Sequence, residues 1–220
     1  MRGGEKELAQ IALKKENILS CGFKLFAEKT IDAVTMNDVA QSAGLGIATL
    51  YRYYKTKTDL VLAVSERTLE KHIKEEWIKR FREEMTGAER IEQYLEALID
   101  IYRKTPEMLR FNQFFNVYVS HEAIEKEKLL PYMQIIDEIR SHFHETYQLG
   151  CSDGTLKQNI GEEQMFSTLL HVMLAAVTRY AVGLVYTSGG SDPLIELECL
   201  KHMMLSEFTA TLSAEEQSNT

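Results

Sequence analysis

Hydroxyl, phenol and guanidinium groups occur close together on one short predicted helix, residues 47–54. Thr49, Arg52 and Tyr53 are expected to face outward at helical spacing, while Leu50 faces inward. The helix follows a glycine-containing turn and another short helix, and this arrangement is typical of a helix-turn-helix unit. The second helix of such a unit enters the major groove of DNA. These residues therefore indicate non-covalent recognition of DNA.

Other reactive side chains are not spaced for catalysis or metal binding. His142 and His144 are two residues apart, so they point to different faces of a helix. His121-Glu122 lacks the second histidine of a zinc-binding helix motif, and there is no Gly-x-Ser-x-Gly or phosphate-binding glycine loop. The widely spaced cysteines are expected to be buried and reduced: Cys21, Cys151 and Cys199. The sequence predicts no enzyme, no metal site and no cofactor.

Two short helices and a tight turn must position the outward-facing side chains. Thr35 suits the N-cap of the first helix, and Asp38 completes a variant of the capping box. Gly44 can adopt a positive φ where that helix ends. Gly46 is tolerated at the N-cap of the second helix, although it lacks a capping oxygen.

From Ile18 to Leu62 the chain reads ILSCGFKLFAEKTIDAVTMNDVAQSAGLGIATLYRYYKTKTDLVL. The motifs are Leu-Phe-Ala-Glu, Val-Thr-Met, Val-Ala-x-x-Ala-Gly and Leu-Tyr-Arg-Tyr-Tyr-Lys-x-Lys-x-Asp-Leu. In this combination the stretch resembles the N-terminal domain of the tetracycline-repressor (TetR) family of bacterial transcription regulators. The resemblance covers about a fifth of the chain. Three positions differ from the usual family pattern. Thr30 stands where the family usually has glycine, Gly46 where serine is common, and Ile47 where lysine or arginine is frequent.

The resemblance implies that outward residues of 47–53 read bases and that their neighbours hold phosphates. Arg52 is expected to bind guanine, whose O6 and N7 accept two guanidinium hydrogen bonds. Tyr51, Tyr53 and Lys57 are expected to donate to phosphates, and Asn37 to a base or a phosphate. The predicted DNA contacts are Thr35, Asn37, Ile47, Ala48, Thr49, Tyr51, Arg52, Tyr53 and Lys57.

Charge is distributed unevenly along the 220 residues. The net charge is −8, but residues 1–57 hold nine Lys and Arg against six Asp and Glu. A locally basic face still attracts phosphate, because charges beyond about 10 Å are screened. The sequence shows no membrane span and no signal-peptide core, and its few cysteines suit a reducing compartment. A cytoplasmic protein is therefore expected.

The predicted architecture is all-α, with about nine helices. Residues 1–57 form a three-helix DNA-binding domain, residues 58–213 a larger helical ligand-binding and dimerisation domain, and residues 214–220 a disordered tail. The other expected elements are helices at 5–28, 57–85, 88–104, from Pro106, 131–149, 161–187 and 192–212, a loop at 150–154 and a hinge at 188–191.

Aromatic side chains are more numerous in the larger domain than a minimal core requires. The resemblance implies a ligand pocket there, and pockets combine apolar walls with a few polar groups. For each residue, ordinary core packing is the alternative. The predicted lining residues are Trp77, Tyr102, Phe111, Phe114, Phe115, Tyr118, Phe143, Phe166, His171 and Met173.

The helix predicted at 161–187 is apolar on two faces, so it requires two packing partners. One partner is the core of its own chain, and a second subunit explains the other. A two-fold dimer would also double the DNA contacts. The predicted interface, completed by helix 192–212, contains Met165, Val172, Ala176, Arg179 and Gly183.

These features together predict a homodimeric repressor that releases a palindromic operator when a small molecule binds its larger domain. An activator of the same fold is an alternative. A helical ligand- or protein-interaction module that does not bind DNA is another. Salt-dependent binding to a promoter fragment separates the last from the others.

Overall fold

The computed structural model describes residues 2–72, 77–183 and 192–210. Over these ranges the backbone is helical, and its only β pairing is an isolated bridge between Leu156 and Thr209. The predicted all-α class is therefore confirmed. The expected hinge at 188–191 and tail at 214–220 lie outside the described residues.

The chain divides into two compact units. The N-terminal unit is Met1–Lys71 with Glu107–Ile135, and the C-terminal unit is His72–Pro106 with Ile136–Thr220. Structural compactness thus groups residues 58–71 and 107–135 with the predicted DNA-binding helices. A functional boundary at residue 57 stays a prediction.

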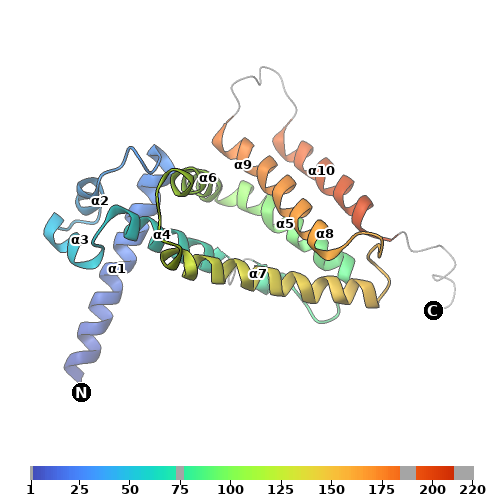
Figure 1. Cartoon of the computed structure of the whole chain (residues 1–220), viewed down its shortest axis with the longest axis horizontal. Coiled ribbons are helices and arrows are strands. Elements are labelled where there is room, and N and C mark those ends of the chain that lie inside the picture. The colour runs from blue at the N-terminus through green and yellow to red at the C-terminus, as the bar shows by residue number, and fades with distance from the viewer. Residues whose placement is uncertain (1, 73–76, 184–191, 211–220) are drawn as a thin grey trace. The chain divides into compact units, whose positions relative to one another are not determined.

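The N-terminal unit is built around a small apolar core. Figure 1 shows its helices: α1 (Arg2–Lys29), α2 (Met36–Ser42), α3 (Ile47–Tyr53), α4 (Lys57–His72), α6 (Pro106–His121) and the start of α7 (Lys126–Ser152). Ile18, Phe26, Leu50, Leu60 and Val64 are all buried in it. Burying each such side chain contributes roughly 1.5–3 kcal/mol. This core holds α3 by its inner face and leaves its outer face exposed.

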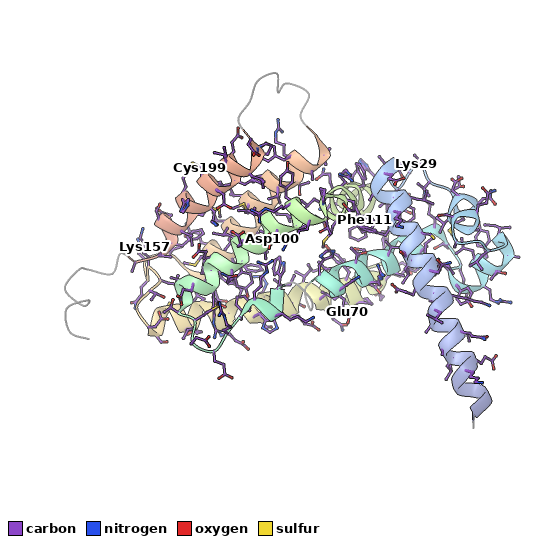
Figure 2. The ribbon with its side chains drawn as sticks, turned by 180° about the vertical axis from the view of Figure 1, so that it is seen from behind. Lys29, Glu70, Asp100, Phe111, Lys157 and Cys199 are labelled. Carbon is purple, nitrogen blue, oxygen red and sulfur yellow. The ribbon has the colours of Figure 1, made fainter. Side chains whose placement is uncertain are left out.

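The aromatic stripe of α6 belongs to this core. The Phe111 ring lies 5.5 Å from that of Phe23 and 6.5 Å from that of Phe26, both on α1. Figure 2 labels Phe111 on the side of α6 that faces α1. Phe115 contacts the Tyr132 ring at 5.1 Å. The four α6 aromatics predicted to line a pocket therefore lie in the N-terminal core: Phe111, Phe114, Phe115 and Tyr118.

Thr30, which follows α1, has a φ of 73°. This left-handed conformation costs an L-residue roughly 1–2 kcal/mol, and a β-branched residue rarely adopts it. The side chain is exposed, so a glycine would lose little packing there. Thr30→Gly should raise the free energy of unfolding by about 1 kcal/mol, as measured by urea denaturation. Gly44→Ala is the control: at φ 67°, with no atom within 4 Å of the added Cβ, it should lose a similar amount through backbone strain alone.

The C-terminal unit comprises η2 (Ile78–Arg80), α5 (Gly87–Lys104), the end of α7, α8 (Glu162–Thr168), η3 (Leu169–Met173), α9 (Leu174–Val182) and α10 (Pro193–Phe208). A row of aromatic rings runs through its core. Tyr94 on α5 contacts Trp77 and Phe143 at centroid distances of 5.7 and 5.6 Å. Phe143 in turn contacts Phe166 at 5.0 Å.

Three predicted element boundaries are wrong. The helix expected at 57–85 is not continuous, because residues 78–80 form a 3-10 turn and 81–85 are not helical. Thr86 instead begins α5, forming a capping box with Glu89. The helix α7 begins at Lys126 and contains Pro131 inside it. It also continues to Ser152, into the expected loop.

The stretch predicted as one regular helix at 161–187 contains the π-helix η3. The wider π turn rotates the residues after it relative to those before it, so a regular helical wheel misplaces side chains across it. Met165 is fully buried in the core of the unit, and it cannot contribute to a subunit interface. His171 is exposed, so it does not line a pocket within this unit.

An ion-pair network fixes the inward face of α10. The Lys201 ammonium is buried and donates to Glu96 on α5 at 2.8 Å and to Glu198 at 2.7 Å. Burial alone would lower the pKa of Lys201, but these carboxylates raise it above its ordinary value. With this face turned to α5, Ile195 and Met203 are left 65% and 63% exposed.

Candidate nucleic-acid interface

The helix α2 is held at its start by the predicted capping box. The Asp38 amide donates to the Thr35 hydroxyl oxygen at 3.2 Å, and the Thr35 amide donates to the Asp38 carboxylate at 2.8 Å. Hydrogen bonds from the side chain and backbone of Thr35 lower the pKa of Asp38. The box therefore stays charged and intact near neutral pH.

The turn and the start of α3 also follow the prediction. Gly44 has a φ of 67°, and Gly46 is the N-cap of α3 without a side-chain cap bond. The helix ends at Tyr53, and Tyr54 is its C-cap. Two short helices thus meet across a glycine turn, which is the helix-turn-helix arrangement.

The outer face of α3 has the composition expected of a DNA-reading surface. Leu50 is fully buried, whereas Ile47 and Tyr51 are 38% and 48% exposed. Ala48 and Arg52 are exposed, and Thr49 is half-buried. This face presents a guanidinium, a phenol, a hydroxyl and apolar carbon, the groups that contact base edges and phosphates.

Tyr53 differs from the expectation that it faces outward. It is half-buried and packs, with Tyr54, against the core of the N-terminal unit. A phosphate contact by Tyr53 stays a prediction.

The flanking predicted contacts lie in the same unit. Thr35 and Asn37 are exposed at the start of α2. The Thr35 hydroxyl donates its only proton to Asp38 at 2.7 Å, so any further hydrogen bond can only be one that it accepts. Lys57, at the start of α4, donates to the Asp32 carbonyl at 3.2 Å. Burial lowers the pKa of Lys57, which Asp32 partly offsets.

The sequence analysis missed how the first turn of α4 is held. Thr56 and Asp59 form a reciprocal cap, with both amide-to-side-chain bonds at 3.0 Å. Lys128 on α7 donates to Asp59 at 3.0 Å, and the Thr58 hydroxyl lies 2.9 Å from that of Tyr118 on α6. The Thr-x-x-Asp spacing of Thr56 and Asp59 is the signal that predicts the cap. Sequence has no comparable signal for the two long-range bonds.

Sequence comparison supports the assignment of this domain. A family model described as "Bacterial regulatory proteins, tetR family" matches residues 18–64. An HTH-type transcriptional regulator of Staphylococcus aureus (strain USA300) is 38% identical over 56 residues, which are 26% of this chain and 30% of that protein. The match therefore covers less than a third of the length of that relative.

Solved structures share the fold over most of the chain. A TetR transcription regulator from Haloarcula marismortui superposes with a TM-score of 0.73 and 16% identity, covering 90% of this chain and 100% of that one. FadR from Bacillus subtilis, in complex with stearoyl-CoA, gives 0.70 and 13%, covering 87% and 98%. Identities this low show the fold alone.

The fold and the site together define an all-α protein with an N-terminal helix-turn-helix and a helical C-terminal unit. Residues 18–64 match the TetR family of bacterial regulators, as the resemblance predicted, and most of the chain shares the fold of a solved TetR regulator.

Two further features concern other kinds of site. Within the described ranges, no group of three or more His, Cys, Asp or Glu side chains is placed to hold a metal ion. The stretch Glu162–Val182 has the length and composition of a membrane-crossing helix. However, Leu169, Met173 and Val177 from this stretch are fully buried in the C-terminal unit. Those contacts are typical of a core helix.

Proposed function

We propose that this protein is a cytoplasmic transcriptional regulator that binds a two-fold symmetric operator as a homodimer and releases it when a small molecule binds the C-terminal unit. The observation that carries the proposal is the outer face of α3, exposed on a capped helix-turn-helix whose inner face is fully buried. The HTH-type transcriptional regulators that match this chain over 56 residues support the same activity.

The direct test is selection of DNA by the full-length protein from a random pool of 30-bp duplexes. We expect a palindromic consensus whose half-site centres lie about one helical turn, or a multiple, apart. The affinity for that consensus should fall steeply with salt, because phosphate contacts release counterions. If the protein selects no duplex at low ionic strength, the result would contradict the proposal and favour the alternative of a helical interaction module that does not bind DNA. An activator and a repressor are separated by reporter transcription from the selected site.

The exposed apolar face of α9 and α10 supports the dimer. The two helices lie side by side (Figure 1). Val172 and Val182 on the η3–α9 segment are 44% and 46% exposed, and Ile195 and Met203 on α10 are more exposed still. Arg179 and Gly183 are also exposed, and Ala176 is half-buried. A self-complementary patch of this kind can form a two-fold interface.

Val172→Arg should weaken dimerisation on the order of a hundredfold, because two-fold symmetry buries the new charge twice. Light scattering at micromolar concentration should then show a monomer, and affinity for the selected duplex should fall with it. Met133→Arg is the matched control, since Met133 is 47% exposed on α7 and belongs to the N-terminal unit. A Val172→Arg protein that stays dimeric would contradict the assignment.

The aromatic row of the C-terminal unit supports a largely apolar ligand. The Trp77 indole N–H is buried, and it has no hydrogen-bond partner within the part of the chain that the structure describes. A buried donor of this kind favours a ligand with a hydrogen-bond acceptor. Of the predicted lining residues, Trp77, Tyr102, Phe143, Phe166 and Met173 remain candidates. The stearoyl-CoA complex of the FadR of similar fold makes long-chain acyl-CoA a reasonable first probe.

Trp77 is also the only tryptophan in the sequence, so tryptophan emission, excited at a wavelength that the ten tyrosines hardly absorb, reports on this location alone. The protein is titrated with stearoyl-CoA and then with other apolar compounds that carry a hydrogen-bond acceptor. A true ligand should change the Trp77 emission and release the selected duplex over the same concentration range. A ligand shifts this equilibrium only if it binds the two conformations with different affinity. Fluorescence changes without DNA release would contradict the regulatory role of the site.

A further inference from the structure

The carbonyl groups at the end of α2 are all accounted for by hydrogen bonds. A helix leaves its last carbonyls without partners inside the helix. Here the turn supplies three donors: the amides of Ala43, Gly44 and Leu45 bond to the carbonyls of Val39, Gln41 and Ala40 at 2.9, 3.0 and 2.8 Å. The carbonyls of Ser42 and Ala43 remain, and the turn itself offers them nothing.

Two side chains from α1 satisfy the remaining carbonyls. The Asn17 amide nitrogen donates to the Ala43 carbonyl at 2.9 Å, and the Cys21 thiol donates to the Ser42 carbonyl at 3.4 Å. The thiol also lies 3.8 Å from the Asn17 amide oxygen. Asn17 and Cys21 are one helical turn apart, so one face of α1 contacts the turn. Ala43 itself is buried, so its carbonyl has limited access to water as an alternative donor.

We propose that Asn17, assisted by Cys21, is a positioning residue for DNA recognition. Its hydrogen bond to the Ala43 carbonyl fixes the turn that sets the angle between α2 and α3. The proposal rests on the proposed DNA-binding function. Neither residue is among the predicted DNA contacts, so any effect on recognition acts through the geometry of the turn.

Loss of this bond should affect specific and non-specific binding differently. Base contacts require α3 to lie in the groove at one angle, whereas phosphate contacts tolerate a range of angles. Without its bond to α1, the turn must be ordered each time α3 docks on its base pairs. In a dimer this ordering is needed in both DNA-binding domains. The ratio of specific to non-specific affinity should therefore fall, while non-specific affinity and its salt dependence stay the same.

The experiment compares Asn17→Asp, Cys21→Ala and Cys21→Ser in the full-length protein. Asn17→Asp keeps the shape of the side chain but replaces the donating amide with an acceptor. Cys21→Ser retains a donor that Cys21→Ala removes. The control is Gln10→Ala, an exposed residue on the same helix. Affinity is measured for the duplex that the wild type selects and for a scrambled duplex, and amide exchange is followed at Gly44 and Leu45.

For Asn17→Asp we expect the affinity for the selected duplex to fall about tenfold more than the affinity for the scrambled duplex, which loses only what the added carboxylate charge costs, and we expect faster exchange at the turn. Cys21→Ala should show a smaller loss that Cys21→Ser restores. The proposal would be overturned if Asn17→Asp and Gln10→Ala had the same ratio of specific to non-specific affinity. It would also be overturned if Asn17→Asp lost affinity for both duplexes by the same factor. If Asn17→Asp does not fold, the same criteria apply to the Cys21 pair. A wild type that selects no duplex would contradict the DNA-binding function instead.

Discussion

Arg52→Ala is expected to reduce affinity for the selected operator by about 30- to 25,000-fold and to remove base preference at one position of each half-site. A bidentate arginine–guanine contact contributes roughly 1–3 kcal/mol of discrimination, and a dimer makes it twice. Arg52 is exposed on the last turn of α3 and has no ion-pair partner among the described side chains, so it is available to a base. Fluorescence anisotropy with the selected duplex measures the loss.

A matched DNA substitution distinguishes base contact from general charge. If Arg52 reads guanine, replacing that guanine with 7-deazaguanine should weaken the wild type and leave Arg52→Ala unaffected. Lys55→Ala is the protein control, because Lys55 is exposed beside α3 and should weaken all duplexes uniformly. Equal effects of 7-deazaguanine on wild type and Arg52→Ala would show that Arg52 contacts phosphate or solvent.

The helix-turn-helix was predictable because its signals are local. Thr35 with Asp38, and the glycines Gly44 and Gly46, specify caps and a turn within a few residues of the backbone that they control. The structure retains each of these features. It also explains Thr30, whose position in the family usually holds a glycine: the backbone there is left-handed. Local rules therefore identified the unit, and the family resemblance identified its departure at Thr30.

Packing partners were not predictable in the same way. An aromatic stripe on a helix shows that the helix is buried, but not which helix covers it. The α6 rings appeared equally suited to a ligand pocket or a core, and the matching Phe23 and Phe26 on α1 lie far away in the sequence. Asn17 was missed for the same reason, since it is 26 residues from the carbonyl that it contacts.

Interrupted helices were the other source of error. Helical periodicity assumes a constant turn, and the π-helix at Leu169–Met173 breaks that assumption within an uninterrupted apolar run. Val172 consequently lies on an exposed face and Met165 in the core, although the regular wheel placed them together. The break after α4 has a different origin. Thr86 is a strong N-cap for α5, so the chain must leave the helical path before it.

Gly87→Ala is expected to destabilise the protein by about 3 kcal/mol, because a methyl group there meets backbone. A Cβ on Gly87 would lie 2.1 Å from the Gly150 Cα and 2.4 Å from the Gly150 amide nitrogen, on α7. Backbone cannot rotate away as a flexible side chain can. The Gly87 amide also donates to Asp153 at 2.8 Å, and the Ala88 amide to Thr155 at 3.0 Å, so separating α5 from this corner breaks polar contacts too.

Urea denaturation followed by circular dichroism measures the loss, and Gly150→Ala provides an independent variant at the same contact. A Cβ on Gly150 would lie 2.3 Å from the Leu156 Cγ, a side chain that is itself buried, so this variant should also be destabilised. Gly161→Ala is the control: it precedes α8, has a φ of −69°, and no atom lies within 4 Å of its added Cβ. A Gly87→Ala protein as stable as Gly161→Ala would show that α5 and α7 do not meet through these two glycines. The near contact between the helices, rather than the freedom of the glycine backbone, is what the substitution tests.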